Sequence, residues 1–245
     1  MVKVESIIKV IHLARKDARI YFFKWPNITF GLFLPAIIYL AFSVGRPTEI
    51  SSTMSGLVAM AALFGAGAIQ SIALPLERAK GTFDRLLAAP LSLTTIVVGK
   101  ALGGFFFGVV LSTGYSLLVI PLSGASLAYP LLFAFGIVIS SFVFSVLGVC
   151  MSAPFRDLPE AMPPATLIRV LMVFLGGVLI PVATLPSFLQ IISYALPLTY
   201  AVDMMQQAMT GHLVSQTFLL DSAALLLFSV VFLAIAVLVL KRTIR

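Results

Sequence analysis

Long apolar runs separated by short polar segments repeat along all 245 residues of the chain. Most of these runs have the roughly 17–25 residues that a helix needs to cross the hydrocarbon core of a bilayer. The pattern predicts an all-α membrane protein whose six transmembrane helices make up one domain, residues 28–245. The predicted spans are 28–44, 54–74, 93–118, 130–151, 167–182 and 218–240.

Residues 1–27 have a different pattern, because apolar side chains recur there every three or four positions among several Lys and Arg. This spacing favours an amphipathic helix lying along a membrane surface over an unstructured basic tail. Trp25 falls where an interfacial aromatic belt is expected, and Pro26 then ends the helix. We therefore predict an interfacial helix before the first span.

A charged segment, Pro75 to Pro90, separates the second span from the third and has the sequence PLERAKGTFDRLLAAP. Its charges stand out in a chain of which only 10% is Asp, Glu, Lys or Arg. Phe83, Leu86 and Leu87 cluster at helical spacing and give a short helix with an apolar edge. Such a helix, at about 75–92, is expected to dock in a groove of a cytosolic partner rather than to form a plain loop.

Two proline-containing segments interrupt the apolar pattern. Residues 183–212 are apolar, but Pro186 and Pro197 cut them into pieces too short to span. They are predicted to form a re-entrant helical hairpin, because interrupted backbone at membrane depth needs protein or a watery cavity around it. Residues 153–164 contain four prolines and are predicted to be a stiff, non-helical connector.

The distribution of basic residues tests this topology. With six spans, Arg46 is the one basic residue on the side opposite the termini, and every other Lys and Arg of the 16 lies on the side of the termini. The positive-inside rule then predicts cytoplasmic termini, a cytoplasmic charged segment and an external hairpin. The net charge of +7 follows from this placement, so nucleic acid is not an expected partner.

Several kinds of chemistry are disfavoured. No segment without a span is long enough to form a soluble catalytic domain. The sequence around Gly99 and Lys100 lacks a P-loop, because Thr94 and Ala101 take the positions of the first Gly and of the Ser or Thr. No charged residue is placed at the middle of a predicted span, which argues against ion coupling. Gln70 is predicted to make a hydrogen bond between helices.

Catalytic or metal sites are not indicated either. His12 and His212 are predicted on opposite sides of the membrane, which disfavours an intramembrane hydrolase. Asp203 and Asp221, near the hairpin, are explained by solvation or local hydrogen bonds as well as by substrate contact. Cys150, the single cysteine, has no disulfide or metal partner and is expected to be a packing residue.

Two groups of residues resemble the type-2 ABC exporter permeases. Glu77-Arg78, Gly81-Thr82, Leu86, Pro90 and Gly99-Lys100 are similar to that family's cytoplasmic signature. Gly177, Pro181, Leu185-Pro186 and Pro197-Leu198-Thr199-Tyr200 are similar to its segment after the fifth span, which forms short re-entrant helices on the outer side. The amphipathic start resembles its interfacial connecting helix, so the resemblance covers essentially the whole chain.

The resemblance implies a transport subunit of the plasma membrane that is not itself an enzyme. A cytosolic ABC ATPase would hold ATP and Mg, this chain would hold no cofactor or metal, and a second permease subunit, identical or different, would complete the path. The residues expected to couple to the ATPase are Glu77, Arg78, Gly81, Thr82, Phe83, Leu86, Leu87 and Pro90. Those expected to form the outer gate are Gly177, Pro181, Pro186, Pro197, Leu198 and Tyr200.

The apolar spans, with few fixed charges, favour a hydrophobic or amphiphilic cargo that is drug-like or lipid-like. The alternatives are a polysaccharide or other-substrate ABC permease of the same class, and an ATP-independent channel or membrane scaffold.

Overall fold

The computed structural model describes residues 2–22, 29–45, 50–89, 91–211 and 214–244. These residues form helices joined by short turns, and none of them is in a strand. The helices are α1 (Val2–Tyr21), the π-helix η1 (Thr29–Phe33), α3 (Leu34–Gly45), α4 (Ile50–Ala79), α5 (Thr82–Ala88), α6 (Leu93–Ser123), α7 (Pro130–Ser152), α8 (Leu158–Leu175), the 3₁₀-helix η3 (Val182–Thr184), α9 (Ser187–Tyr194), α10 (Pro197–Thr210) and α11 (Ser215–Ile244).

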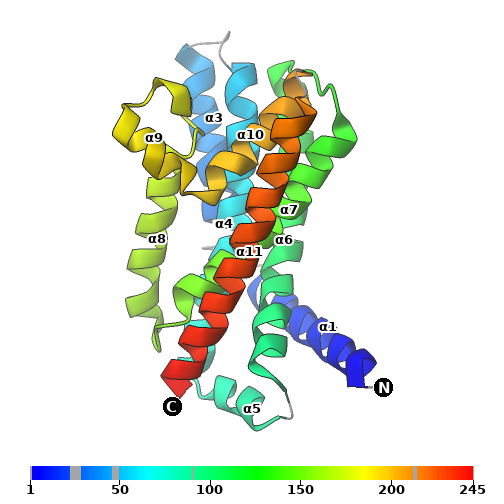
Figure 1. Ribbon diagram of the computed structural model, residues 1–245, viewed down its shortest axis with the longest axis vertical. Coiled ribbons are helices and arrows are strands. Elements are labelled where there is room, and N and C mark those ends of the chain that lie inside the picture. The colour runs from blue at the N-terminus through cyan, green and yellow to red at the C-terminus, as the bar shows by residue number, and fades with distance from the viewer. Residues whose placement is uncertain (1, 23–28, 46–49, 90, 212–213, 245) are drawn as a thin grey trace.

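The long helices form a bundle around α4, which contacts α6, α7, α8 and α10. Every residue of α4 from Met54 to Pro75 is buried. Helix α5 and both ends of the chain lie at one end of the bundle, here called the α5 end, and α9 and α10 lie at the other (Figure 1). This arrangement agrees with the predicted topology, in which both termini and the charged segment share one side.

Glycines bring the central helices into backbone contact. A Cβ atom added to Gly148 of α7 would lie 2.5 Å from the carbonyl oxygen of Gly67 in α4. One added to Gly108 of α6 would lie equally close, at 2.5 Å, to the Cβ of Ala66. Small residues let membrane helices pack this closely, so these glycines form a packing face between α4, α6 and α7.

Within the described residues, five helices are long and apolar enough to cross a membrane, or up to six if the bent pair α9–α10 counts as one span. The five are Thr53–Ala79, Leu93–Ser123, Pro130–Ser152, Leu158–Leu175 and Ser215–Thr243. The first predicted span, 28–44, is found as η1 and α3, whose apolar part, Gly31–Ala41, is shorter. Helices α9 and α10 meet at 88°, as expected of a broken span or a re-entrant segment.

The prediction of a non-helical connector at 153–164 was wrong in its second half. Helix α8 begins at Leu158, with Pro159 in its first turn and Pro163 and Pro164 inside it, and it ends at Leu175. At Pro159 the missing N–H would have no helical partner, because it falls in the first turn. Pro163 and Pro164 lie further along, where each removes one helical hydrogen bond and its ring crowds the carbonyl four residues before it. Because Pro159, Glu160 and Pro163 are exposed, the carbonyls that lose a donor lie at an open helix end. The fifth span, predicted at 167–182, is therefore displaced toward the N-terminus.

The bounds around the charged segment also differ from the prediction. Helix α4 continues through the buried Pro75 to Ala79, so Glu77 and Arg78 belong to the end of the second span. The separate short helix is only α5, Thr82–Ala88. Packing on all sides of α4 outweighs the hydrogen bond that Pro75 removes, because most helical stability in proteins comes from tertiary packing.

Candidate functional site

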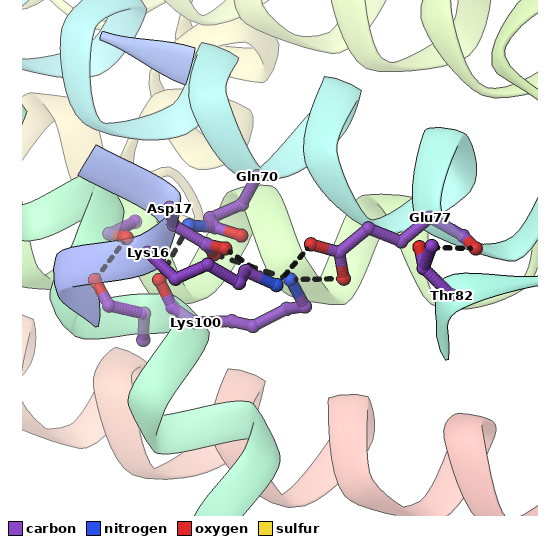
Figure 2. A network of polar contacts seen from close by, with 8 residues as sticks. Lys16, Asp17, Gln70, Glu77, Thr82 and Lys100 are labelled. Atoms are coloured by element: carbon purple, nitrogen blue, oxygen red, sulfur yellow. Dashed lines mark hydrogen bonds and ion pairs between the residues drawn. The ribbon is translucent and has the colours of Figure 1, made fainter. Parts of the chain in front are cut away.

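Four charged side chains from three helices meet at the α5 end, and we call them the ion network (Figure 2). Lys16 and Asp17 come from α1, Glu77 from α4 and Lys100 from α6. Glu77 accepts from Lys16 Nζ at 2.6 Å through Oε1, and its Oε2 lies 2.7 Å from Lys100 Nζ. Asp17 Oδ2 lies 3.2 Å from Lys100 Nζ, and its Oδ1 lies 3.3 Å from Lys16 Nζ.

The ion network is formally neutral, and three of its four side chains are buried. Asp17 and Lys100 have exposed fractions of 0% and 1%, and Glu77 has 4%. Burial alone would lower the pKa of Lys16, but the carboxylates of Asp17 and Glu77 outweigh burial and raise it. Lys16 therefore stays protonated at neutral pH. Each charge faces opposite charges, which is the condition under which buried ions are tolerated.

Local sequence explains why these residues meet. Asp17 lies on the apolar face of α1, three residues after Ala14 and four before Tyr21, both of which are buried. Lys100 lies on the glycine face of α6, where a Cβ added to Gly99 would come within 2.8 Å of the Leu13 side chain. Because α1 packs so closely on α6, the buried Asp17 reaches the buried Lys100.

Gln70 also contributes to this contact. Its Nε2 donates to the backbone oxygen of Lys100 at 2.5 Å, so α4 and α6 are joined by a side chain within the membrane-spanning region. The predicted role of Gln70 as a hydrogen bond between helices is confirmed.

Helix α5 is attached to the end of α4 by a tight turn. Gly81 has a φ of 66°, in the left-handed region that favours glycine, and its N–H donates to the Arg78 oxygen at 2.9 Å. The hydroxyl of Thr82 donates to the backbone oxygen of Glu77 at 3.1 Å. The first residue of α5 is thus hydrogen-bonded to the backbone of Glu77, whose side chain belongs to the ion network.

Arg78 holds the same turn against the rest of the bundle. Its Nη1 donates to the backbone oxygens of Ala153 and Phe155, at 2.8 and 2.7 Å, in the turn between α7 and α8. Its guanidinium carbon lies 5.3 Å from the centre of the Phe83 ring, within cation–π range. One side chain therefore joins α4, α5 and the α7–α8 turn.

The expectation that Phe83 is an apolar docking residue was wrong. Phe83 is 1% exposed and belongs to a buried cluster with Leu74, Ile96 and Leu240, so it holds α5 to its own chain. The predicted helical spacing was correct, but the largest apolar side chain of this short helix is buried against its own bundle instead of being left for a partner.

The outward face of α5 is mainly polar. Asp84, Arg85 and Ala88 are exposed, whereas Leu86 and Leu87 are half-buried. Leu87 lines a groove with Arg156 and Asp157 of the α7–α8 turn, and Leu86 lines another with residues of α1. Pro90 lies outside the described residues.

The predicted gate residues gather where α8, α9 and α10 meet. Helix α8 ends before Gly176, where an added Cβ would approach the buried Leu198 to 3.0 Å, and Gly177 has a φ of 81°. Tyr200 Oη donates to the Tyr194 oxygen at 2.7 Å, across the bend between α9 and α10. The prolines stand at helix starts: Pro181 before η3, Pro186 before α9 and Pro197 as the first residue of α10. Their role in gating stays a prediction.

The remaining candidates are Asp203, Asp221, His212 and Cys150. Asp221 accepts from Gln207 Nε2 at 3.1 Å, Asp203 is exposed, and His212 lies outside the described residues. Cys150 is a half-buried free cysteine. Within the described ranges, no three His, Cys, Asp or Glu residues are placed to hold a metal ion.

Sequence reasoning missed the roles of Lys16, Asp17 and Lys100 and assigned Glu77 to the partner interface alone. Two signals pointed to the ion network. Asp17 interrupts the apolar face of an otherwise amphipathic helix, and Lys100 stands between glycines that mark a packing face. The buried Arg169 was also missed, because the fifth span was predicted to begin beside it.

Known proteins align with most of this chain. A sequence model described as ABC-2 type transporter matches residues 10–210. The probable multidrug ABC transporter permease YbhR of Escherichia coli (strain K12) is 29% identical over 156 residues, which are 62% of this chain and 41% of that protein. The aligned part is thus less than half of the E. coli relative.

Nodulation protein J from two rhizobial species is also similar. The protein of Rhizobium leguminosarum bv. viciae is 27% identical over 212 residues, which are 84% of this chain and 81% of that protein. The protein of Sinorhizobium fredii (strain NBRC 101917 / NGR234) is 28% identical over 159 residues, which are 63% of this chain and 60% of that protein. With the family model covering more than half of its length, the chain belongs to the ABC-2 type transporter family.

Proposed function

We propose that this chain is the membrane-spanning permease subunit of an ABC exporter and that a separate ATPase subunit binds at α5. The observation that carries the proposal is the attachment of α5. Glu77 and Arg78, directly before it, connect it to α1, α6 and the α7–α8 turn through buried ion pairs and backbone hydrogen bonds. A displacement of α5 would therefore move several helices together.

The ATPase holds ATP and Mg and does the chemistry, and this chain converts its closure into helix movement. The docking surface in this proposal is the polar outward face of α5, with Asp84 and Arg85 setting orientation and the half-buried Leu86 and Leu87 at its edges. Charge complementarity of this kind selects a partner and its register more than it adds affinity.

The positive-inside rule supports an α5 end in the cytoplasm. Both termini are then cytoplasmic, and α9 and α10 are on the outer side of the plasma membrane, where they gate the exit. A second permease subunit completes the path. A hydrophobic or amphiphilic cargo is supported by the apolar composition of the chain and by its similarity to a relative described as a probable multidrug permease.

Co-purification with a co-expressed ABC ATPase tests the docking surface. Asp84→Arg combined with Arg85→Glu reverses both exposed charges at constant net charge, and we expect the variant to lose the ATPase. Thr210→Glu combined with Gln216→Arg introduces the same charges at the far end of the bundle and is expected to retain it. Unchanged association of the first variant would refute docking at α5.

A transport assay in liposomes separates this proposal from a channel or scaffold. Cargo movement should stop when the ATPase carries a hydrolysis-blocking substitution. Movement that continues at the same rate with the blocked ATPase would show an ATP-independent pathway.

A further inference from the structure

Arg169 is a buried charge outside the ion network, and nothing in the proposed coupling path uses it. It lies in α8 and is 6% exposed. Its Nη2 donates to the backbone oxygen of Gly67 at 3.1 Å and to the hydroxyl of Ser71. Both acceptors are neutral groups of α4.

The contrast with Lys100 is informative. Lys100 is as deeply buried, but it faces the carboxylates of Asp17 and Glu77. Among the residues that the structure describes, no acidic side chain forms an ion pair with Arg169. A guanidinium stays protonated, so its positive charge inside the bundle is hydrogen-bonded but not neutralised.

Arg169 lies well inside Leu158–Leu175, one of the helices that are long and apolar enough to cross a membrane. Helix α4 continues for about two turns beyond Ser71 and about three beyond Gly67 before it ends at Ala79. At 1.5 Å per residue, the guanidinium is roughly 12–18 Å from the α5 end of that helix. The expectation that no charged residue lies deep in a span was therefore wrong for α8. Ionisable groups at such depth mark substrate or ion pathways more often than they serve packing.

Arg169 also lines a crevice between α4 and α8. Phe64, Ala68 and Ile72 contribute from α4, and Met162, Ala165 and Thr166 from α8. The wall is apolar except for the guanidinium and two hydroxyls, which suits a ligand with one charged group on an apolar body. The cavity volume is about 20 Å³, which is enough for one water molecule, so a larger group enters only when α8 separates from α4.

We propose that Arg169 binds the anionic headgroup of an amphiphilic cargo between α4 and α8. Phosphate, sulfate and carboxylate share the required chemistry, because each offers paired oxygens to the planar fork of an arginine. This inference rests on the proposed export function and narrows its cargo to anionic amphiphiles.

Binding to the permease alone tests the site without depending on the ATPase. The protein is placed in phosphatidylcholine nanodiscs, and equilibrium binding of radiolabelled decyl phosphate is compared with that of decanol. We expect Arg169→Met to weaken decyl phosphate binding by about tenfold or more, the usual effect of losing a charge-assisted hydrogen bond, and to leave decanol within twofold. Equal affinity of Arg169→Met and the parent chain for decyl phosphate would overturn the proposal.

A second variant guards against misfolding. Thr166→Phe fills the crevice and leaves the charge in place, and it is expected to weaken binding of both ligands. If Arg169→Met does not give a monodisperse protein, retained decyl phosphate affinity in Thr166→Phe overturns the proposal. Arg169→Lys keeps the charge but not the fork and is expected to bind with intermediate affinity.

Further binding measurements distinguish a cargo from free phosphate and from a resident lipid as the source of the anion. Excess inorganic phosphate should compete weakly, because the apolar wall adds affinity only for an alkyl chain. Phosphatidylglycerol in the nanodisc should leave the decyl phosphate affinity within twofold, and full competition would assign the site to a resident lipid instead of a cargo. With the ATPase added, decyl phosphate should stimulate hydrolysis through Arg169. Binding without stimulation would refute its role as cargo but leave the anion site standing.

Discussion

At the scale of single residues, the buried charges at the α5 end act as a unit. Lys100 faces two carboxylates, and removing it leaves Glu77 and Asp17 with Lys16 as their only basic partner in the described ion network. Lys16 already contacts both acids, but its single positive charge balances only one of the two carboxylates. The three helices would then be joined by a cluster with net negative charge.

We therefore expect Lys100→Met to lower the free energy of unfolding by about 3–5 kcal/mol, as for other buried pairs broken on one side. The thermal midpoint in mild detergent measures the loss. Lys80→Met is the matched control, because Lys80 is exposed and the change there should stay within about 0.5 kcal/mol. Equal midpoints for the two variants would show that the ion network adds no stability.

Glu77→Gln combined with Lys100→Met should cost less than the sum of the single changes, because each single variant leaves an unpaired charge that the double variant removes. Additive losses in the same thermal assay would mean that the two side chains are not coupled.

The Gly81 turn gives a residue-scale prediction about the start of α5. At a φ of 66°, an alanine is strained by about 1–2 kcal/mol, although an added Cβ meets nothing within 4 Å. Gly81→Ala should lower the thermal midpoint, and Gly81→Asn should lower it less because asparagine tolerates this region. A larger effect of Asn than of Ala would contradict the backbone explanation.

At the scale of elements, stability depends on how closely α4, α6 and α7 approach. A Cβ on Gly104 of α6 would lie 2.3 Å from Ser145 Oγ and 2.6 Å from the Ala66 oxygen. We expect Gly104→Ala to destabilise the bundle by about 1–3 kcal/mol, because the helices must separate. Gly114→Ala in the same helix meets nothing within 4 Å and should be neutral or stabilising by up to about 1 kcal/mol. Similar unfolding midpoints for both would argue against close packing at Gly104.

At the scale of the whole molecule, the two ends of the bundle should be reached from opposite sides of the membrane. In a Cys150→Ser background, Ala88→Cys and Ser187→Cys place exposed thiols on α5 and α9, respectively. An impermeant maleimide should label Ser187→Cys in intact cells and Ala88→Cys in inside-out vesicles. The reverse pattern would place the termini outside and invert the proposed direction of coupling.

The positions of the spans could be predicted because hydrocarbon imposes a minimum apolar length, and the alternation of basic residues placed both termini on one side. The expectation that proline ends a helix was wrong in α8 and α4, and the reason is local in each case. Proline was treated as a helix breaker, but at the exposed start of α8 it removes few needed donors, and at Pro75 the surrounding helices hold α4 together. Phe83 shows that sequence spacing has a similar limit. The spacing predicts which face of α5 carries Phe83, but not whether that face packs on the bundle or on a partner.

The sequence by itself determined the membrane class, the order of the helices and the location of a short polar helix between the second and third spans, because these depend on local length, periodicity and charge. Only the tertiary structure decided which charges meet. Lys16 and Glu77, which pair at 2.6 Å, are far apart in the chain, and Arg169 reaches Gly67 from another helix. The hydrophobic pattern determines which face of each helix is buried. Contacts between glycines determine how closely the helices approach one another and how each is rotated about its axis. That docking determines whether a buried charge is neutralised, as at Lys100, or left without an acidic partner in the described residues, as at Arg169.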